Sequence, residues 1–398
     1  MIDRRLLAAL ITLLAVLASN AVSADETAPY FPTAEEWETV APTDAGADPA
    51  KLESALAFAE KHKSKGVVIL WRGRIVAERY WRRWSEERPH AAYSVTKSVI
   101  STLVGIAIAE RKIEGPEQSV AHFLPEWKGK EEYEAITVGH LLSMTGGLEG
   151  GGRTFRRGLR ARDERAFATG LPVEHPPGTR WEYHNSAYRL LFSVLEAATG
   201  TPPPEYLSEK LLTPLGMTRT RLGTKWFARD QYTYMTTTAR DAARFGLLVL
   251  RNGEWQGKQC VPKEWLARAT APIHPDVNPS YGYLWWLNGG GHHFLPLRPR
   301  KKVGPIFPGC PEDAFAALGK DDQKIYVVPS LDLVVTRFGD AARASANALS
   351  GFDAEFLGRV CGSFEKPQST SRPTSKPTTK PTTKPTSRPT PKSRPKDL

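Results

Sequence analysis

The stretch AAYSVTKSVISTLVGIAIAE, Ala91 to Glu110, contains a strong helix with an unusual beginning. From Ser98 onward, apolar residues such as Val99 and Leu103 recur at helical spacing. Lys97 stands in the first turn, where the helix dipole disfavours a cation. A serine that opens a helix usually acts as a cap and has Glu or Gln three residues later, whereas here that position is a lysine. A residue that breaks a local rule in this way is typical of a functional site.

The chain is long enough to bury a sizeable core in one large domain or two lobes. With 398 residues, 40% of them hydrophobic, and 11 Trp, 12 Tyr and 15 Phe, its composition is that of a globular protein. At the N-terminus, Arg4 and Arg5 precede an apolar run from Leu6 to Ala18, and small residues follow as far as Ala24. This pattern predicts a signal peptide at residues 1–24 and an exported protein that is periplasmic, envelope-associated or extracellular.

Most of the positive charge belongs to the C-terminal end. The formal net charge is +11, and residues 366–398 contain nine Lys or Arg and one Asp, which is +8 and leaves +3 for the rest. Tetrads such as KPTT repeat there, and proline at this spacing excludes helix and sheet, so we expect a disordered tail. We expect this tail either to adhere to an anionic cell envelope or to act as a solvated spacer. Since the domain itself is nearly neutral, no nucleic acid partner is expected.

Residues 25–365 show no repeat and no long linker, and we expect one domain. The predicted elements are, in order, an amphipathic helix at 48–62, a hairpin at 66–81, the helix of the opening stretch, helical pieces over 115–290, three short strands after 311 and a helix at 341–361. Strands therefore lie at both ends of the sequence. The simplest packing is an α/β fold of the α+β type, with one antiparallel sheet built from both chain ends, flanking helices and an all-helical lobe. A ligand cleft is expected between the two parts.

Ser94 and Lys97 lie three residues apart, so their side chains share one face of the helix. A lysine held in a cleft loses hydration, which lowers its pKa. The neutral amine can then take the Ser94 proton, and the first-turn N–H of Ser94 points to where an oxyanion would form. The S-x-x-K spacing is weak evidence alone, because Ser393 and Lys396 repeat it in the tail.

Longer segments accompany this motif in a fixed order. They are SVTKSVISTLVGIAIAERKIEG, ITVGHLLSMTGGL, HPPGTRWEYHNSAYRLLFSVLEAATG, TARDAARFGLLVLRNGEWQGKQCVPKEW and YGYLWW. Together they resemble the serine β-lactamase and penicillin-binding protein superfamily, in its branch of class C β-lactamases, esterases and 6-aminohexanoate-dimer hydrolases. The resemblance implies that Ser94 is the acylated nucleophile and Lys97 its proton acceptor. It further implies that Tyr183 relays protons, aided by a cationic neighbour, and that Asn185 hydrogen-bonds into the network of Lys97 and the substrate.

The third motif of the superfamily is where this chain departs. The K-T-G or H-T-G that binds a substrate carboxylate in β-lactamases is missing, and LGKDDQ is similar to the G-x-x-x-Q of esterase and amidase relatives. We expect the second oxyanion donor at Gly319 or Lys320, with Ala317 as the next candidate. Lys320 either replaces the missing cation or is a solvated turn residue. This departure argues against strong β-lactam hydrolysis.

The leading hypothesis is an exported serine hydrolase that forms an acyl-enzyme on an ester, amide or lactam carbonyl, most readily as an esterase or small-amide hydrolase. The alternatives are a D,D-peptidase or β-lactamase acting on peptidoglycan or β-lactams, and a non-catalytic module that binds the envelope. The substrate is expected to be a small molecule or peptidoglycan-like. No metal or cofactor is expected, because His292, His293 and Cys310 lack the spacing of a tetrahedral site. Trp285 and Trp286 either line the cleft or fill the core.

Overall fold

The two β-rich runs near the N-terminus form a hairpin, as the sequence predicts. Strands β1 (Ser64–Trp71) and β2 (Arg74–Tyr80) are joined by Arg72 and Gly73, whose φ angles of 50° and 86° lie in the left-handed region. A two-residue turn with both φ angles positive matches the right-handed twist of paired strands. On its other edge β1 pairs antiparallel with β13 (Leu333–Gly339), so the hairpin joins the C-terminal strands.

The computed structural model describes residues 29–225, 228–296, 298–343 and 349–364. The predicted signal at 1–24 and the predicted tail at 366–398 lie outside these ranges. All described residues belong to one unit, Met1–Glu365.

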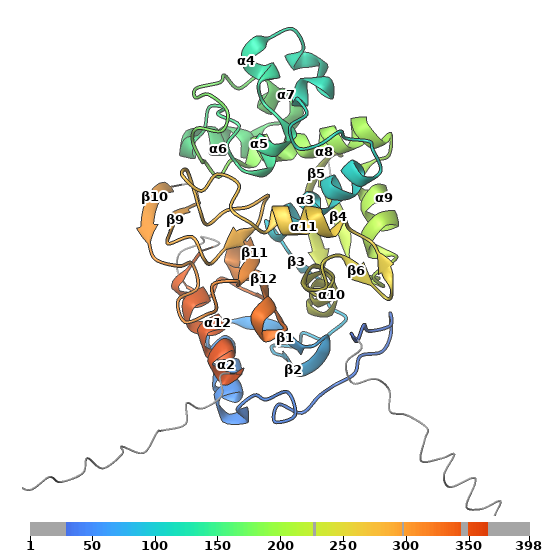
Figure 1. Cartoon of the computed structure of the whole chain (residues 1–398), viewed down its shortest axis with the longest axis vertical. Coiled ribbons are helices and arrows are strands. Elements are labelled where there is room, and N and C mark those ends of the chain that lie inside the picture. Colours follow the sequence, from blue (N-terminus) through green and yellow to red (C-terminus); the bar gives the residue numbers. More distant parts are fainter. Residues whose placement is uncertain (1–28, 226–227, 297, 344–348, 365–398) are drawn as a thin grey trace, which may run out of the picture. The chain divides into compact units, whose positions relative to one another are not determined.

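The main sheet is built from both ends of the chain (Figure 1). Its order is β2-β1-β13-β12-β11-β8, and every neighbouring pair is antiparallel. Besides β13, the C-terminal half contributes three strands. They are β12 (Gln323–Val328) and β11 (Phe315–Gly319), which lie inside the sheet, and β8 (Trp286–Leu287), which forms its edge. The predicted mixed fold with an antiparallel sheet and flanking helices is therefore confirmed.

Helices cover both faces of this sheet. The Tyr326 hydroxyl of β12 donates to Asp353 of α12 at 2.7 Å, whereas the neighbouring Ile325 lies against Gly246 of α10. Successive side chains of a strand point to opposite faces, so α12 and α10 lie on opposite sides of the sheet. Helix α2 packs with α12, and α3 packs on β11 and β12. The bounds of these helices are α2 (Pro49–Lys61), α3 (Val95–Ala109), α10 (Ala239–Leu250) and α12 (Gly351–Phe364).

Helix α3 is the centre of the molecule. Thirteen of its 15 residues are buried, as expected for a helix that is apolar on nearly all sides. It contacts the sheet through β11, and it also packs against α8 (Asn185–Thr199) and α11 (Lys263–Ala269). The contact with α11 is close at Gly105, where a Cβ would lie 2.1 Å from the Trp265 ring. Within the described ranges, no helix combines the length and apolar content that crossing a membrane requires.

The middle of the chain is less purely helical than predicted. Strand β5 (Ala228–Thr237) pairs with β4 (Arg221–Lys225) on one edge and with β3 (His90–Ala91) on the other, in a second antiparallel sheet of order β3-β5-β4. The prediction of an all-helical block over 115–290 is therefore wrong in this part. Tyrosine and threonine are good strand formers, and the run YTYMTTT, which ends β5, was the signal for it.

The remaining elements of the middle are short. They are α4 (Glu131–Glu134), α5 (Val138–Leu142), α6 (Gly151–Arg160), α7 (Glu164–Thr169), α9 (Pro203–Leu207), a π-helical turn (Ser208–Leu212), and the strand pairs β6 (Glu254–Trp255) with β7 (Lys258–Gln259) and β9 (His292–Leu295) with β10 (Arg298–Val303).

Helix α12 begins later than the sequence suggested. The predicted start at 341 is wrong: residues 341–343 are not helical, and the helix begins at Gly351. Ser350 sets this start, because its hydroxyl accepts the Phe352 N–H and donates to Asp322. The buried Lys324 ammonium lies 2.8 Å from Asp353 in the first turn, which anchors the helix to β12.

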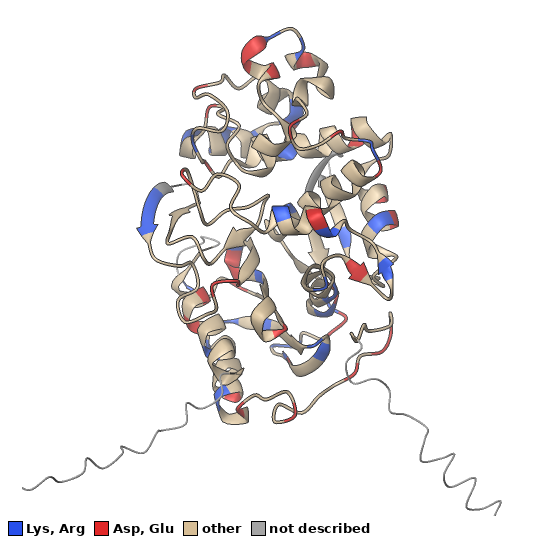
Figure 2. Cartoon of the chain, viewed as in Figure 1, with Lys and Arg blue, Asp and Glu red and all other residues tan. Residues whose placement is uncertain are grey.

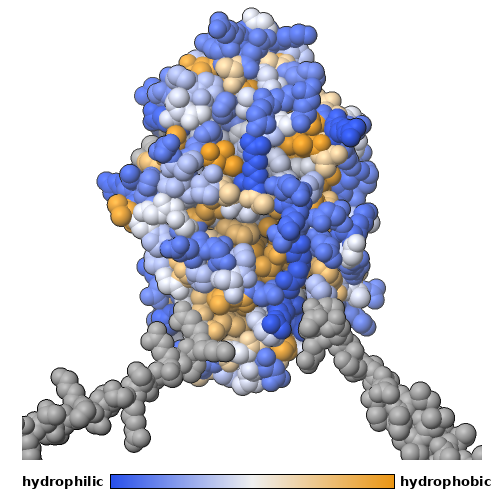
Figure 3. All heavy atoms as spheres, viewed as in Figure 1, coloured by the Kyte–Doolittle hydropathy of each residue, from blue (hydrophilic) through white to orange (hydrophobic). Residues whose placement is uncertain are grey.

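Charged groups are interspersed over most of the surface, and hydrophilic residues dominate the face shown in Figure 3 (Figures 2 and 3). Strand β10 is an exception to the mixing of signs, because its sequence RPRKKV holds four cations and no acid. Helix α6, with the sequence GGRTFRRGLR, likewise contains only basic charged residues.

The close approach of α3 and α11 gives the first prediction. Gly105→Ala should lower the free energy of unfolding by about 1–3 kcal/mol, because the new methyl group overlaps the Trp265 ring. Gly362→Ala in α12 is the control: a Cβ there meets no atom within 4 Å, so stability should hold or rise by up to about 1 kcal/mol. Guanidinium unfolding midpoints measure both. Equal midpoints for Gly105→Ala and the wild type would contradict the packing described here.

Candidate active site

Ser94 stands at the N-terminus of α3 without capping it. It has φ −72° and ψ −5°, and its side chain makes no capping hydrogen bond to the helix. The residue before it, Tyr93, has φ 47°, a conformation that bulky residues rarely adopt and that is common at functional sites. Thr96 holds this turn in place, because its hydroxyl donates to the Tyr93 carbonyl at 2.6 Å and accepts the Met235 N–H at 2.9 Å. The Ser94 hydroxyl is therefore available for chemistry.

Lys97 points back at Ser94, as the spacing predicts. Its Nζ lies 3.1 Å from Ser94 Oγ and 2.7 Å from Asn185 Oδ1. Burial lowers the pKa of Lys97 well below its usual range, and the positive charge of Arg189 adds to this. A neutral amine has two N–H groups and one lone pair. It can donate to Asn185 while its lone pair accepts the Ser94 proton.

Tyr183 completes the cluster around Ser94. Burial raises the pKa of its phenol far above the usual value. The Ser94 side chain lies within hydrogen-bonding reach and lowers this pKa by a smaller amount. The Lys97 Nζ lies 4.9 Å from the Tyr183 ring centroid. With a neutral amine beside it and a raised pKa, the phenol is protonated at neutral pH. Tyr183 is thus in a state that can donate a proton, and a neutral Lys97 does not provide the cationic neighbour that the resemblance implied.

His184 fixes the segment that carries Tyr183 and Asn185. It is the N-cap of α8, where its Nδ1 accepts the Ala187 N–H at 3.1 Å and its Nε2 donates to the Glu149 carbonyl at 2.9 Å. Burial lowers the pKa of His184, which favours the neutral ring that this pair of hydrogen bonds requires. Asn185 is then the first residue of α8, and its amide oxygen faces Lys97.

The end of β11 passes against the turn that holds Ser94. A Cβ on Gly319 would lie 2.4 Å from the Ala92 carbonyl oxygen, so only glycine fits at this approach. Strand β8 pairs with β11 only at Phe315 and Ala316, which leaves the outer edge of the strand beyond them without a strand partner in the described residues. Within the same residues, the Ser94 N–H has no hydrogen-bond acceptor. An oxyanion beside Ser94 Oγ would find these backbone donors.

Lys320 is in the turn that follows β11. Its side chain is 56% exposed, lies 3.9 Å from Asp321 and places its Nζ 5.5 Å from the Tyr93 ring centroid. The sequence left open whether Lys320 replaces the missing cation or is a solvated turn residue, and this geometry matches a turn residue. It nevertheless lies at the entrance to the site, beside the residue that precedes Ser94.

Two neighbours of Lys97 escaped the sequence analysis. Arg189 and Tyr188 follow Asn185 by four and three residues on α8, a helical spacing that places them near it. The Tyr188 ring lies 4.3 Å from Lys97 Nζ. Arg189 pairs with Glu164 of α7 and acts on Lys97 through its charge. The helical periodicity downstream of Asn185 could have identified both.

Trp285 and Trp286 have different positions, one in the core and one beside the site. Trp286 stacks on Tyr183, with ring centroids 5.9 Å apart, and so forms a wall of the site. Trp285 is fully buried between Phe245 and Phe315 and belongs to the core.

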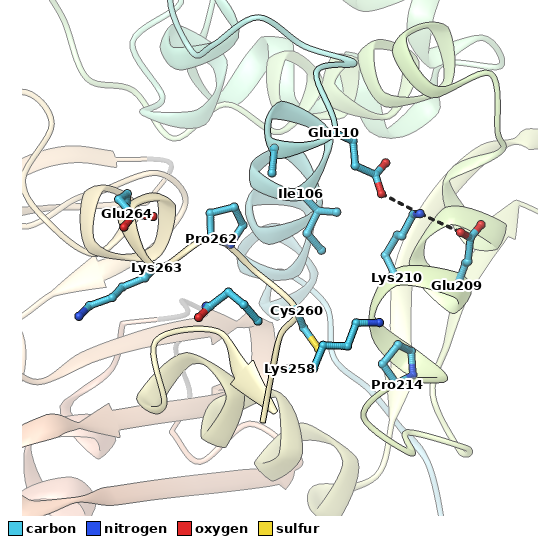
Figure 4. A pocket seen from close by; sticks show the side chains of 12 residues that line it. Ile106, Glu110, Glu209, Lys210, Pro214, Lys258, Cys260, Pro262, Lys263 and Glu264 are labelled. Atoms are coloured by element: carbon cyan, nitrogen blue, oxygen red, sulfur yellow. Dashed lines mark ion pairs between the residues drawn. The ribbon is translucent and has the colours of Figure 1, made fainter. Parts of the chain in front are cut away.

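A separate hollow of about 860 Å³ opens near the C-terminal end of α3 (Figure 4). Glutamates and lysines both line it, and Lys210 pairs there with Glu110 and Glu209. Its lining contains none of Ser94, Lys97 and Tyr183. Cys260 in its wall is a free thiol whose pKa is raised by burial, which makes it a poor nucleophile. The candidate site is therefore at the other end of the helix.

In the described ranges, no three side chains of His, Cys, Asp or Glu lie close enough together to hold a metal ion. His140 instead closes a capping box with Thr137 at the start of α5.

Comparison with known proteins supplies independent information. The model of the beta-lactamase family matches residues 51–340. The 6-aminohexanoate-dimer hydrolase of Paenarthrobacter ureafaciens is 26% identical over 257 residues, which is 56% of this chain and 64% of the relative. A Bacillus anthracis protein named for the same hydrolase superposes with a TM-score of 0.65 at 21% identity, covering 84% of this chain and 88% of its own. A penicillin-binding protein homologue from Caulobacter crescentus gives a TM-score of 0.61 at 15% identity, over 80% and 98% of the two chains.

Burial of Lys97 leads to a stability prediction. Its pKa is lowered in the folded state, so below the usual lysine pKa of about 10.4 the unfolded chain holds a proton that folding must release or bury. Lys97→Met should therefore raise the melting temperature at pH 7, by roughly 2–4 °C for each kcal/mol gained. The difference in melting temperature between Lys97→Met and the wild type should shrink as the pH rises toward 10. Thermal melts between pH 6 and pH 10 measure it, and a lower melting temperature at pH 7 would contradict a costly buried amine.

Arg189 leads to a prediction about pH dependence. Lys97 must be neutral to accept a proton, so Ser94 reactivity should rise with pH through the pKa of Lys97. Arg189→Gln removes a cation that lowers this pKa, and the acid limb should move to higher pH. Arg189→Lys retains the charge and should leave the limb near its wild-type position. The rate of Ser94 labelling by a fluorophosphonate against pH measures the shift, and coincident limbs for all three proteins would exclude this role.

Proposed function

The chain belongs to the beta-lactamase family of serine hydrolases, and we propose that it hydrolyses an ester or small amide through an acyl-enzyme on Ser94. The observation that carries this proposal is the 3.1 Å contact between Lys97 Nζ and Ser94 Oγ, in surroundings that favour the neutral amine. A protonated lysine could not accept the serine proton. The desolvated one can, and Asn185 holds it in position.

Each step of the reaction then has a group to perform it. Ser94 Oγ bonds to the carbonyl carbon while its proton passes to Lys97 Nζ, and the carbonyl π electrons move onto oxygen. The Ser94 N–H and the edge of β11 near Gly319 stabilise that oxyanion. Tyr183 donates a proton to the leaving group as the intermediate collapses and regains one from Lys97. Water then attacks the acyl-enzyme while one of its protons passes to Lys97 Nζ, and Lys97 returns that proton to Ser94 Oγ as the bond to the acyl carbon breaks and the acid leaves.

The preference for an ester or small amide rests on the third motif. Lys320 is exposed in a turn, so the described strand edge offers no buried cation for a β-lactam carboxylate. A relative named as a hydrolase of the 6-aminohexanoate dimer, which contains an amide, agrees with this preference. The structural likeness to a penicillin-binding protein homologue concerns the fold, and it keeps D,D-peptidase or β-lactamase activity as the second candidate.

We place the enzyme outside the cytoplasm. The charged and apolar pattern of residues 1–24 is the support for export. The cationic repeat at 366–398 would then hold the domain near an anionic envelope polymer or act as a spacer.

Active-site labelling tests the nucleophile. Wild-type protein should react with a fluorophosphonate or with fluorescent penicillin, and Ser94→Ala should not. Lys97→Met should label at least about 100-fold more slowly, as expected for loss of a general base. Ser101→Ala is a matched control on the same helix, because its buried hydroxyl has no partner among the described residues. Absence of Ser94-dependent labelling by either probe would favour the non-catalytic envelope-binding module.

A substrate panel then separates the reaction classes. We expect p-nitrophenyl esters and small p-nitroanilides to be turned over faster than nitrocefin or a D-Ala-D-Ala peptide. Faster nitrocefin or peptide turnover would replace the esterase or amidase assignment by the second candidate.

A further inference from the structure

Helix α6 presents a row of arginines that the fold does not need. Arg153, Arg156 and Arg160 are exposed, and in the described part of the chain none of them makes an ion pair within 4.0 Å. Arg157 differs from them, because it pairs with Glu149 at 3.0 Å and packs over the Phe167 ring. Like charges three and four residues apart destabilise a helix. Three of the four arginines thus lack an ion pair to offset this repulsion, although the charge of Arg153 helps to lower the pKa of Glu149.

Strand β10 adds a second cationic element. Arg300, Lys301 and Lys302 are consecutive and exposed, and none makes an ion pair with a described residue. Figure 2 shows β10 as a run of basic residues, with basic positions on α6 as well. We call Arg153, Arg156 and Arg160 together with Arg300, Lys301 and Lys302 the cationic rim.

The helix and the strand pair that carry the cationic rim contact the residues next to Tyr183. Glu182 accepts the Gly151 N–H at the start of α6, and Trp181 stacks on Phe294 of β9, the partner strand of β10. These contacts are made by the two residues immediately before Tyr183. A small hollow is lined by residues from the start of α6 and by Tyr183 and Asn185, which places the helix directly at the site.

The extent of the rim indicates what it binds. Arg153 to Arg160 spans about 10 Å along α6 at 1.5 Å per residue, and β10 extends the positive charge further. One carboxylate would occupy a fraction of this length. A row of anionic groups would engage several cations at once, and arginine pairs well with carboxylate and phosphate.

We propose that the cationic rim binds a polyanionic chain to which the scissile ester or amide is attached, on the side of the leaving group. This inference rests on the proposed function of Ser94. The side follows from Tyr183, whose protonated phenol serves the leaving group and which borders the rim. The enzyme thereby selects substrates whose departing part carries several carboxylates or phosphates.

Matched peptides test the proposal. O-acetylserine followed by four glutamates and O-acetylserine followed by four glutamines share the scissile ester and differ in charge. The glutamate peptide should have a kcat/KM at least tenfold higher at 20 mM NaCl, mainly through a lower KM. At 0.5 M NaCl the preference should fall to about twofold, because salt screens exposed charges. Mass spectrometry of acetate loss measures both rates.

Charge-removal variants locate the preference. Two triple variants each remove the charges of one element, and each should reduce the preference for the glutamate peptide severalfold. They are Arg153→Ser/Arg156→Ser/Arg160→Ser on α6 and Arg300→Ser/Lys301→Ser/Lys302→Ser on β10. Lys258→Ser/Lys263→Ser is the matched control, since these lysines border the hollow at the far end of α3 (Figure 4). The control should keep the full preference, and all variants should label at Ser94 at the wild-type rate.

Peptide binding to the Ser94→Ala protein tests the cationic rim independently of the reaction at Ser94. Fluorescence anisotropy with the labelled peptides should show tighter binding of the glutamate peptide, lost in the rim variants and retained in the lysine control. Equal affinity for the two peptides, or equal loss in the control, would overturn the proposal whatever the rates are. Missing Ser94 labelling together with intact glutamate selectivity would instead overturn the proposed hydrolase and leave the rim as a binding surface.

Discussion

The removal of Lys97 from water is the constraint on which the site depends. An ammonium group so deeply buried would need a carboxylate beside it, and the structure surrounds it with an amide, two aromatic rings and a nearby guanidinium. Burial and the guanidinium disfavour the ammonium form, and the ring faces, which attract a cation, do not replace the hydration that it has lost. Helix α3 provides the burial, because it is enclosed by the sheet on one side and by α8 and α11 on the other. The packing of the whole domain thus sets the protonation state of one side chain.

The same packing explains why Ser94 is exposed to its partners. Tyr93 takes a left-handed conformation. Thr96 of α3 accepts the Met235 N–H of β5, and Gly319 of β11 lies against the Ala92 carbonyl, so both strands hold the turn. Two sheets therefore meet at the start of one helix. The catalytic cluster combines residues from α3 and from the beginning of α8, and the strand edge supplies only backbone. This division lets the third motif vary in sequence while its geometry remains suitable for an oxyanion.

Much of the fold could be predicted from local patterns. The turn at Arg72 and Gly73 and the β-rich runs at both ends of the domain indicated the sheet, because these signals act within a few residues. The second sheet was missed although β4 and β5 are neighbours in sequence and the Tyr- and Thr-rich run of β5 was a local signal; only its pairing with the two-residue β3 is distant in sequence. At the site, the helical spacing of Ser94 and Lys97 predicted their contact. Helical spacing after Asn185 could have placed Arg189 near it, but the effect of the Arg189 charge on Lys97 depends on how α8 packs against α3.

The origin of the main sheet has a consequence for when the enzyme becomes reactive. Val68 pairs with Thr336, so the central strands come from opposite ends of the domain. They can pair only after the C-terminal strand has been synthesised. Gly319, which closes on the turn before Ser94, also belongs to the late part. A nascent polypeptide therefore holds its serine, lysine and tyrosine long before they form a reactive centre. Incomplete translation products, and chains cut before the last strand, should be inert even though every catalytic side chain is present.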